Sequence, residues 1–218
     1  MNKPSEHPIL MSGPRVREIL DGLKTQTRRA IRPQPPECIL GSHLLATDVA
    51  SPSGYSLVSD EYGAIQLKCP YGKPGDRLWV RETIYYNLEH DNFYFAADRK
   101  GCGNEIYQRL KKKTHPSIHM PRWASRITLE VMSVRVERIQ DISVDDIKAE
   151  IGEKTIVDQL PAFPAPIPKG VDPEEHLDKI FRIVARRLFK DVWNGINAKR
   201  GLGWDENPYC WIIEFKVI

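Results

Sequence analysis

The clearest helical pattern lies near the start of the chain, over residues 12–21. Apolar side chains recur there at the spacing of one helical face and are Val16, Ile19, Leu20 and Leu23. Ser12 stands at a position suited to an N-cap, and Gly22 is a residue type that ends helices. The pattern therefore predicts a helix of about two to three turns that stops at Gly22.

Two further helices are predicted in the second half of the chain. The segment 143–152 opens with an S-x-x-D capping box and closes with a glycine, which predicts a short helix through Glu150. A longer amphipathic pattern begins at Asp172 and has Gly195 as its predicted end. Its apolar stripe comprises Leu177, Ile180, Phe181, Val184, Leu188 and Val192.

Alternating polar and apolar residues, together with β-branched and aromatic runs, predict the strands. The strongest signal covers residues 126–139, where the alternation breaks at Met132-Ser133 and indicates a bulge. The other predicted strands are 24–31, 77–86, 93–98 and 211–218.

Strands separated by helices, without regular βαβ alternation, predict an α+β fold around a mainly antiparallel or mixed curved sheet. The chain has no G-x-G-x-x-G and no G-x-x-x-x-G-K-[ST] motif, which disfavours the nucleotide-cofactor folds. We therefore expect no cofactor.

The amino-acid composition limits the classes of protein to which the chain can belong. Hydrophobic residues make up 41% of the 218, enough for a packed core. The sequence contains no apolar run of about 18 residues and no apolar signal segment at its start, so we expect a cytoplasmic protein without a membrane span. Its four cysteines are widely spaced without a C-x-x-C, as in a reducing compartment, and no metal site is expected. The net charge of +3 is too small to indicate a nucleic-acid binder by itself.

The segment 22–29 groups several residues that could take part in catalysis. Lys24 and Thr27 stand three residues apart where the predicted helix passes into a strand. A threonine hydroxyl needs a base to act as a nucleophile, and a lysine can be that base when burial and neighbouring cations lower its pKa. A solvated, basic strand end without chemistry is the alternative, which the local residues alone favour. The charge gathered by Lys24, Arg28 and Arg29 suits a small anionic or nucleoside ligand.

The same segment, Gly22-x-Lys24-x-x-Thr27-x-Arg29, resembles the G-x-K-x-x-[ET]-x-R signature of ASCH domains. A longer pattern is similar to phage- and prophage-encoded members of that family; it includes 12–14, 74–82 and 123–127. The resemblance implies a PUA-like curved β-barrel with flanking helices. It also implies one domain over residues 1–218, with insertions near 33–70, 99–122 and 151–175.

Small members of the family include amidohydrolases that remove the acetyl group from N4-acetylcytidine with a lysine, a threonine nucleophile and a glutamate. By motif and chain order, the resemblance places these roles on Lys24, Thr27 and Glu150. A solvated glutamate at a helix end is the alternative for Glu150. Other family members are thought to bind or cleave RNA.

Six further residues are candidates for substrate binding. Arg28 and Arg29 lie within the motif, and the others are Arg81, Glu82, Trp123 and Arg126. Trp123, between basic neighbours, is the best candidate for stacking on a base. The 81–82 pair fits a barrel mouth or a solvated strand face equally well.

Three functions remain open at this point. The first is hydrolysis of an amide on a modified nucleoside or RNA. The second is a nucleic-acid binding module or ribonuclease that uses Arg28, Arg29, Arg81 and the basic clusters at 109–113 and 182–190. The third is a phage accessory protein that binds a host protein.

Overall fold

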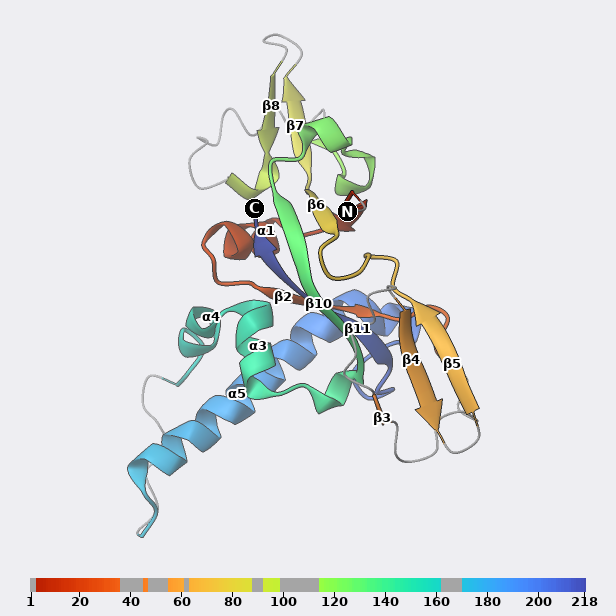
Figure 1. The fold of residues 1–218 in the computed structure, drawn as a ribbon. Helices are drawn as coiled ribbons and strands as arrows, with labels where there is room; N and C mark the ends of the chain where they lie inside the picture. The colour runs from red at the N-terminus through yellow and green to blue at the C-terminus, as the bar shows by residue number, and fades with distance from the viewer. Residues whose placement is uncertain are drawn as a thin grey trace.

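The computed structural model describes residues 3–35, 45–46, 55–60, 63–87, 92–98, 114–161 and 170–218. The basic cluster at 109–113 and much of the predicted insertions 33–70 and 99–122 lie outside these residues. The described strands form three sheets with helices beside them, which confirms the α+β class (Figure 1).

The strands are β1 (Glu6–Leu10), β2 (Gln26–Ala30), β3 (Leu45–Ala46), β4 (Tyr55–Asp60), β5 (Gly63–Lys68), β6 (Arg77–Arg81), β7 (Ile84–Asn87), β8 (Asn92–Phe95), β9 (Thr114–His115), β10 (Thr128–Arg138) and β11 (Tyr209–Val217). The α-helices are α1 (Gly13–Leu20), α3 (Val144–Ile151), α4 (Glu153–Val157) and α5 (Pro173–Asn197).

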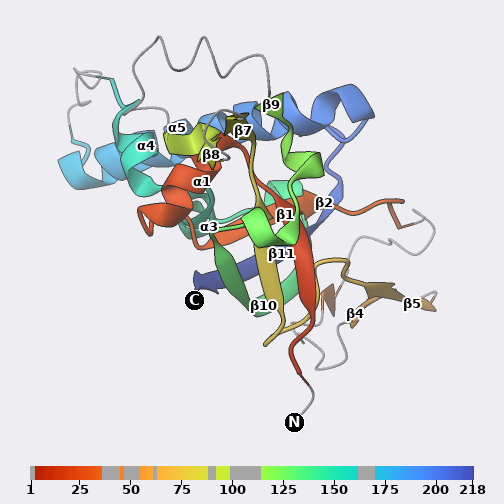
Figure 2. The same cartoon turned by 90° about the horizontal axis from the view of Figure 1, so that it is seen from above.

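The central sheet has the strand order β1-β6-β10-β11-β2. Strands β1 and β6 are parallel and the other neighbours are antiparallel, so the sheet is mixed. The register of β10 against β11 shifts between Val131 and Ser133, where the sequence predicts a bulge. Two small sheets, β3-β4-β5 and β8-β7-β9, extend from different sides of the central one (Figures 1 and 2).

The barrel implied by the family resemblance is not closed. Strands β1 and β2 are the two edges of the central sheet, and they do not pair with each other within the described residues. The prediction of a barrel is therefore wrong, whereas that of a mixed sheet with flanking helices is confirmed.

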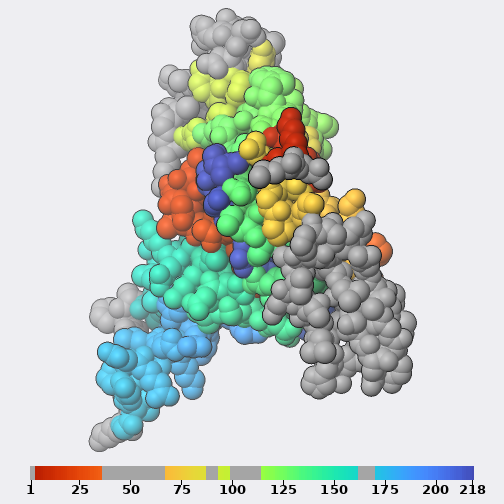
Figure 3. All heavy atoms as spheres, viewed as in Figure 1, coloured from red at the N-terminus to blue at the C-terminus, as the bar shows by residue number. Residues whose placement is uncertain are grey.

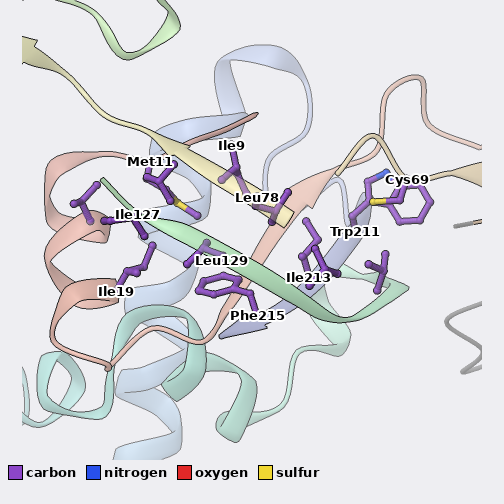
Figure 4. Packing of buried hydrophobic residues seen from close by; sticks show 14 of the residues in the cluster. Ile9, Met11, Ile19, Cys69, Leu78, Ile127, Leu129, Trp211, Ile213 and Phe215 are labelled. Atoms are coloured by element: carbon purple, nitrogen blue, oxygen red, sulfur yellow. The ribbon is translucent and has the colours of Figure 1, made fainter. Parts of the chain in front are cut away.

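Side chains alternate along β11 between the two faces of the central sheet. Both faces are buried against other parts of the chain. Trp211, Ile213 and Phe215 belong to a hydrophobic cluster that includes Val16 and Ile19 of α1 (Figure 4). Cys210 and Ile212 point to a second cluster, built with α3, α4 and α5. The sheet therefore separates α1 from the other helices.

The three predicted helices are observed, and only the last one ends later than predicted. Helices α1 and α3 lie within the segments 12–21 and 143–152. Helix α5 starts after its predicted N-cap but continues through Gly195 to Asn197, because Trp193 and Asn197 are buried on its last turns. Its N-terminal end projects from the body of the molecule (Figure 3).

The single strand predicted over 77–86 is two strands in different sheets. Strand β6 ends at Arg81 and β7 begins at Ile84. Between them, the buried carboxylate of Glu82 forms an ion pair with Arg126 at 2.9 Å, a long-range contact that local alternation does not indicate.

Candidate active site

A cavity of about 380 Å³ lies along the free edge of β2. In Figure 1, β2 runs between α1 on one side and α3 and α5 on the other. Lys24, Thr27, Arg28, Arg29 and Glu150 all line this cavity, so the structure brings together the three predicted catalytic residues and two of the predicted binding residues.

Lys24 is held at the cavity by the turn that follows α1. Gly22 has φ +69°, a conformation that glycine adopts readily, and the backbone N–H of Lys24 donates to the carbonyl of Glu18. The Lys24 side chain is buried, with 3% of the residue exposed. Its Nζ donates to the backbone carbonyl and to Oε2 of Glu150, both at 2.7 Å.

Glu150 lies in the last turn of α3 and is 6% exposed. Ser143 caps the start of this helix by accepting from the N–H of Asp146 at 3.0 Å, and Gly152 ends it with φ +77°. The second carboxylate oxygen, Oε1, accepts no hydrogen bond from the described residues, although Arg28 Nη1 lies 3.9 Å away. Glu150 Oε1 is therefore a buried acceptor without a hydrogen-bond donor among the described residues.

Burial lowers the pKa of Lys24, and this effect exceeds the opposing effect of the Glu150 charge and hydrogen bond. Within the described residues Lys24 Nζ has two acceptors, the backbone carbonyl and Oε2 of Glu150. An ammonium group has three hydrogens and no lone pair, whereas a neutral amine has two hydrogens and one lone pair. Action as a base therefore requires the neutral form, which burial favours.

Arg28 connects the site to the sheet and to α3. Its Nη2 donates to Asp146 at 2.9 Å and to Glu137 at 3.2 Å. Burial by itself would raise the pKa of Asp146, but the charges of Arg28 and Arg135 lower it overall. The Nε and Nη1 atoms of Arg28 are buried and donate to no described residue.

Thr27 and Arg29 reach the cavity from the other face of β2. Thr27 pairs with Ile213 of β11 and is 4% exposed, and its hydroxyl makes no hydrogen bond within the described part of the chain. The Nη2 of Arg29 donates to the carbonyl of Leu10 and to Met11 Sδ, which fixes the guanidinium beside the end of β1.

The opposite wall of the cavity is apolar and comes from the C-terminal half of α5. It consists of Phe189, Val192, Trp193 and Ile196. A polar wall facing an aromatic and aliphatic one suits a flat, polar heterocycle.

The remaining predicted binding residues lie elsewhere, and none of them lines this cavity. Arg126 forms ion pairs with Glu82 and Asp98 and lies over the Phe95 ring. Burial raises the pKa of Glu82, and the ion pair with Arg126 offsets this in part. Arg81 donates to the carbonyl of Ile118. Arg126 and Glu82 therefore partner each other, whereas Arg81 is held by a backbone carbonyl.

Trp123 differs from that group because it is 73% exposed. Its ring meets the Phe93 ring edge to face, with centroids 5.8 Å apart. It remains the candidate for stacking on a base outside the cavity.

Three arginines of the cavity lining, Arg15, Arg32 and Arg200, are not among the site residues predicted from the sequence. Arg32 follows the end of β2, and Arg200 lies in the short 3-10 helix after α5. Arg32 is close to the motif in sequence, but no pattern marks Arg200.

Within the described residues, no three or more His, Cys, Asp or Glu side chains are grouped to hold a metal ion. None of the helices described is long and apolar enough to cross a membrane. No protein-family model, curated protein or solved structure matches this chain.

Proposed function

We propose that this chain is an ASCH-type, PUA-like amidohydrolase that removes the acyl group from the exocyclic amine of an acylated cytosine such as N4-acetylcytidine. Thr27 is the nucleophile, Lys24 is its base, and Glu150 orients Lys24 and contacts the leaving amine. The observation that carries the proposal is the buried Lys24, which donates two hydrogen bonds to Glu150 in the cavity that Thr27 also lines.

The reaction proceeds in two balanced steps. Thr27 Oγ1 bonds to the acyl carbon while its proton passes to Lys24, and the C–N bond then breaks as Lys24 returns that proton to the amine. Water attacks the resulting ester and gives a proton to Lys24, which passes it to the departing Thr27 oxygen. The sum is amide and water converted to amine and carboxylic acid.

The unpaired polar atoms of the cavity complement an acylated amine. Such a group offers one N–H donor and one carbonyl acceptor. Glu150 Oε1 can accept from the N–H, and Arg28 Nη1, 3.9 Å from it, can donate to the carbonyl and stabilise the developing oxyanion. The apolar wall of α5 provides a surface for the pyrimidine ring.

The test is loss of the acetyl group from N4-acetylcytidine, followed by chromatography. Thr27→Ala should lower kcat by about a thousandfold or more, because removal of a nucleophile leaves only binding and oxyanion stabilisation. Thr25→Ala is the matched control, since Thr25 lies two residues away and is exposed. Equal rates in wild type and Thr27→Ala would exclude Thr27 as the nucleophile.

The exposed Trp123 supports a second candidate, a nucleic-acid binding surface. RNA affinity should then fall steeply with salt and fall again in Trp123→Ala. RNA binding that does not change with salt or with this substitution would count against the second candidate.

A further inference from the structure

The lining of the Lys24 cavity carries far more positive than negative charge. Glu150 is its one acidic residue within the described part of the chain. The basic lining residues are Arg15, Lys24, Arg28, Arg29, Arg32 and Arg200. An excess of this size, on a chain of net charge +3, is a local feature of the site.

Three of these six basic side chains contact carboxylates inside the protein. Arg15 pairs with Glu18 at 2.6 Å, Lys24 contacts Glu150, and Arg28 contacts Glu137 and Asp146. Arg29, Arg32 and Arg200 form no ion pair with any residue that the structure describes.

The three unpaired guanidinium groups come from the elements that build the cavity. Arg29 is held beside β1, Arg32 follows β2, and Arg200 follows α5. Arg32 and Arg200 are exposed and therefore lie toward solvent, whereas Lys24 and Glu150 are buried. A ligand that reaches both groups has its reacting amide inside and an anionic group at the mouth.

We propose that the cavity takes a phosphorylated nucleoside, a pyrimidine nucleoside monophosphate, whose phosphate is bound by Arg32 and Arg200 with Arg29 beside them. This assignment rests on the proposed function and names the substrate class of that site. Guanidinium groups bind phosphate oxygens through paired hydrogen bonds, and a phosphate monoester carries about 1.5 to 2 negative charges at neutral pH.

A monophosphate fits the three charges better than the alternatives. A neutral nucleoside leaves them unpaired, and a phosphodiester within RNA carries a single charge. The cavity volume of about 380 Å³ lies within the range of small-ligand sites. Arg29, Arg32 and Arg200 all line this one cavity, which favours a single localised anionic group.

Binding of cytidine 5′-monophosphate and of cytidine, measured by calorimetry at low salt, tests this assignment without any turnover. Wild type should bind the monophosphate at least about tenfold more tightly, because hydrogen bonds between charged groups are among the strong ones. Arg32→Ala/Arg200→Ala should lose this preference. The control Arg187→Ala/Lys199→Ala removes the same charge from exposed residues of α5 and its following turn, outside the cavity lining, and should keep it.

Equal affinity for the two ligands, no binding of either, or an unchanged preference in Arg32→Ala/Arg200→Ala would overturn the assignment. Tighter binding of an RNA oligonucleotide, lost in the same double variant, would overturn the monophosphate in favour of RNA. Hydrolysis of N4-acetylcytidine without any gain from a 5′-phosphate would overturn the phosphate site and leave the proposed function intact. A phosphate preference that depends on both arginines, in a protein without hydrolytic activity, would support the phosphate site and remove the proposed function.

Discussion

At the scale of single residues, the proposed activity depends on one buried contact between Lys24 and Glu150. Two acceptors of the same glutamate hold the lysine, and burial disfavours its charged form. A structural ion pair would gain from a charged lysine, whereas a base requires a neutral one. The pH dependence of the reaction distinguishes these two roles.

The variant Glu150→Gln tests the protonation of Lys24. The Glu150 charge raises the pKa of Lys24, so removing it should lower that pKa further. Because the neutral amine is the active form, kcat/KM should rise with pH along a limb centred below the ordinary lysine value of 10.5. In Glu150→Gln this limb should move to lower pH, and the maximal rate should fall. A limb that stays in place or moves to higher pH would contradict the role of Lys24.

At the scale of elements, the cap of α3 sets the position of Glu150. Ser143→Ala removes the hydrogen bond to the Asp146 N–H and should lower the free energy of unfolding by about 1 kcal/mol. Ser12 is a matched control, because it occupies the N-cap of α1 without a side-chain hydrogen bond. Urea unfolding of Ser12→Ala should show a change of a few tenths of a kcal/mol. Equal losses in the two variants would show that the Ser143 cap is not specifically stabilising.

Local patterns predict elements well where one face of a segment is buried. They predict α1, α3 and the bulge of β10, because capping residues and alternation are local properties. They fail at Gly195, where burial of Trp193 and Asn197 extends the helix through a residue that usually ends one. The break after Arg81 also depends on a distant partner.

The site was predictable only in part. The motif marks Lys24 and Thr27, but Glu150 is 126 residues from Lys24 and was placed by chain order within the resembled family. Arg200 has no sequence signal, because its place at the cavity follows from how α5 ends.

At the scale of the whole molecule, Arg28 joins the central sheet to the helices that cover one of its faces. It contacts Glu137 of β10 and Asp146 of α3 from the edge strand that also carries Thr27. The same contacts therefore hold the sheet, α3 and the cavity together.

Replacing this connection should destabilise the fold in a pH-dependent way. Arg28→Met should lower the free energy of unfolding by about 2–3 kcal/mol, less than for a fully buried pair because both acidic partners are partly exposed. The arginine lowers the pKa of Asp146, so its contribution is present above the unfolded value and is lost as the pH falls through the folded one.

Urea unfolding at neutral and acidic pH checks this expectation. The difference between wild type and Arg28→Met should shrink as the pH falls below about 4. Arg182→Met is the control, since its ion pair with Asp178 is exposed to solvent and should contribute much less to stability than the Arg28 contacts. A deficit in Arg28→Met that does not change with pH would show that lost packing, and not the ion pair, is responsible.

The proposed role of the Thr27 hydroxyl, attack on the acyl group, can be tested directly. The experiment measures acetyl release from N4-acetylcytidine by wild type, Thr27→Ser and Thr27→Ala. Serine keeps a hydroxyl at this position of the cavity that Lys24 also lines, whereas alanine removes it. We expect measurable hydrolysis in Thr27→Ser and hydrolysis at the background rate in Thr27→Ala. Hydrolysis by Thr27→Ala at the wild-type rate would show that the Thr27 hydroxyl is not the nucleophile.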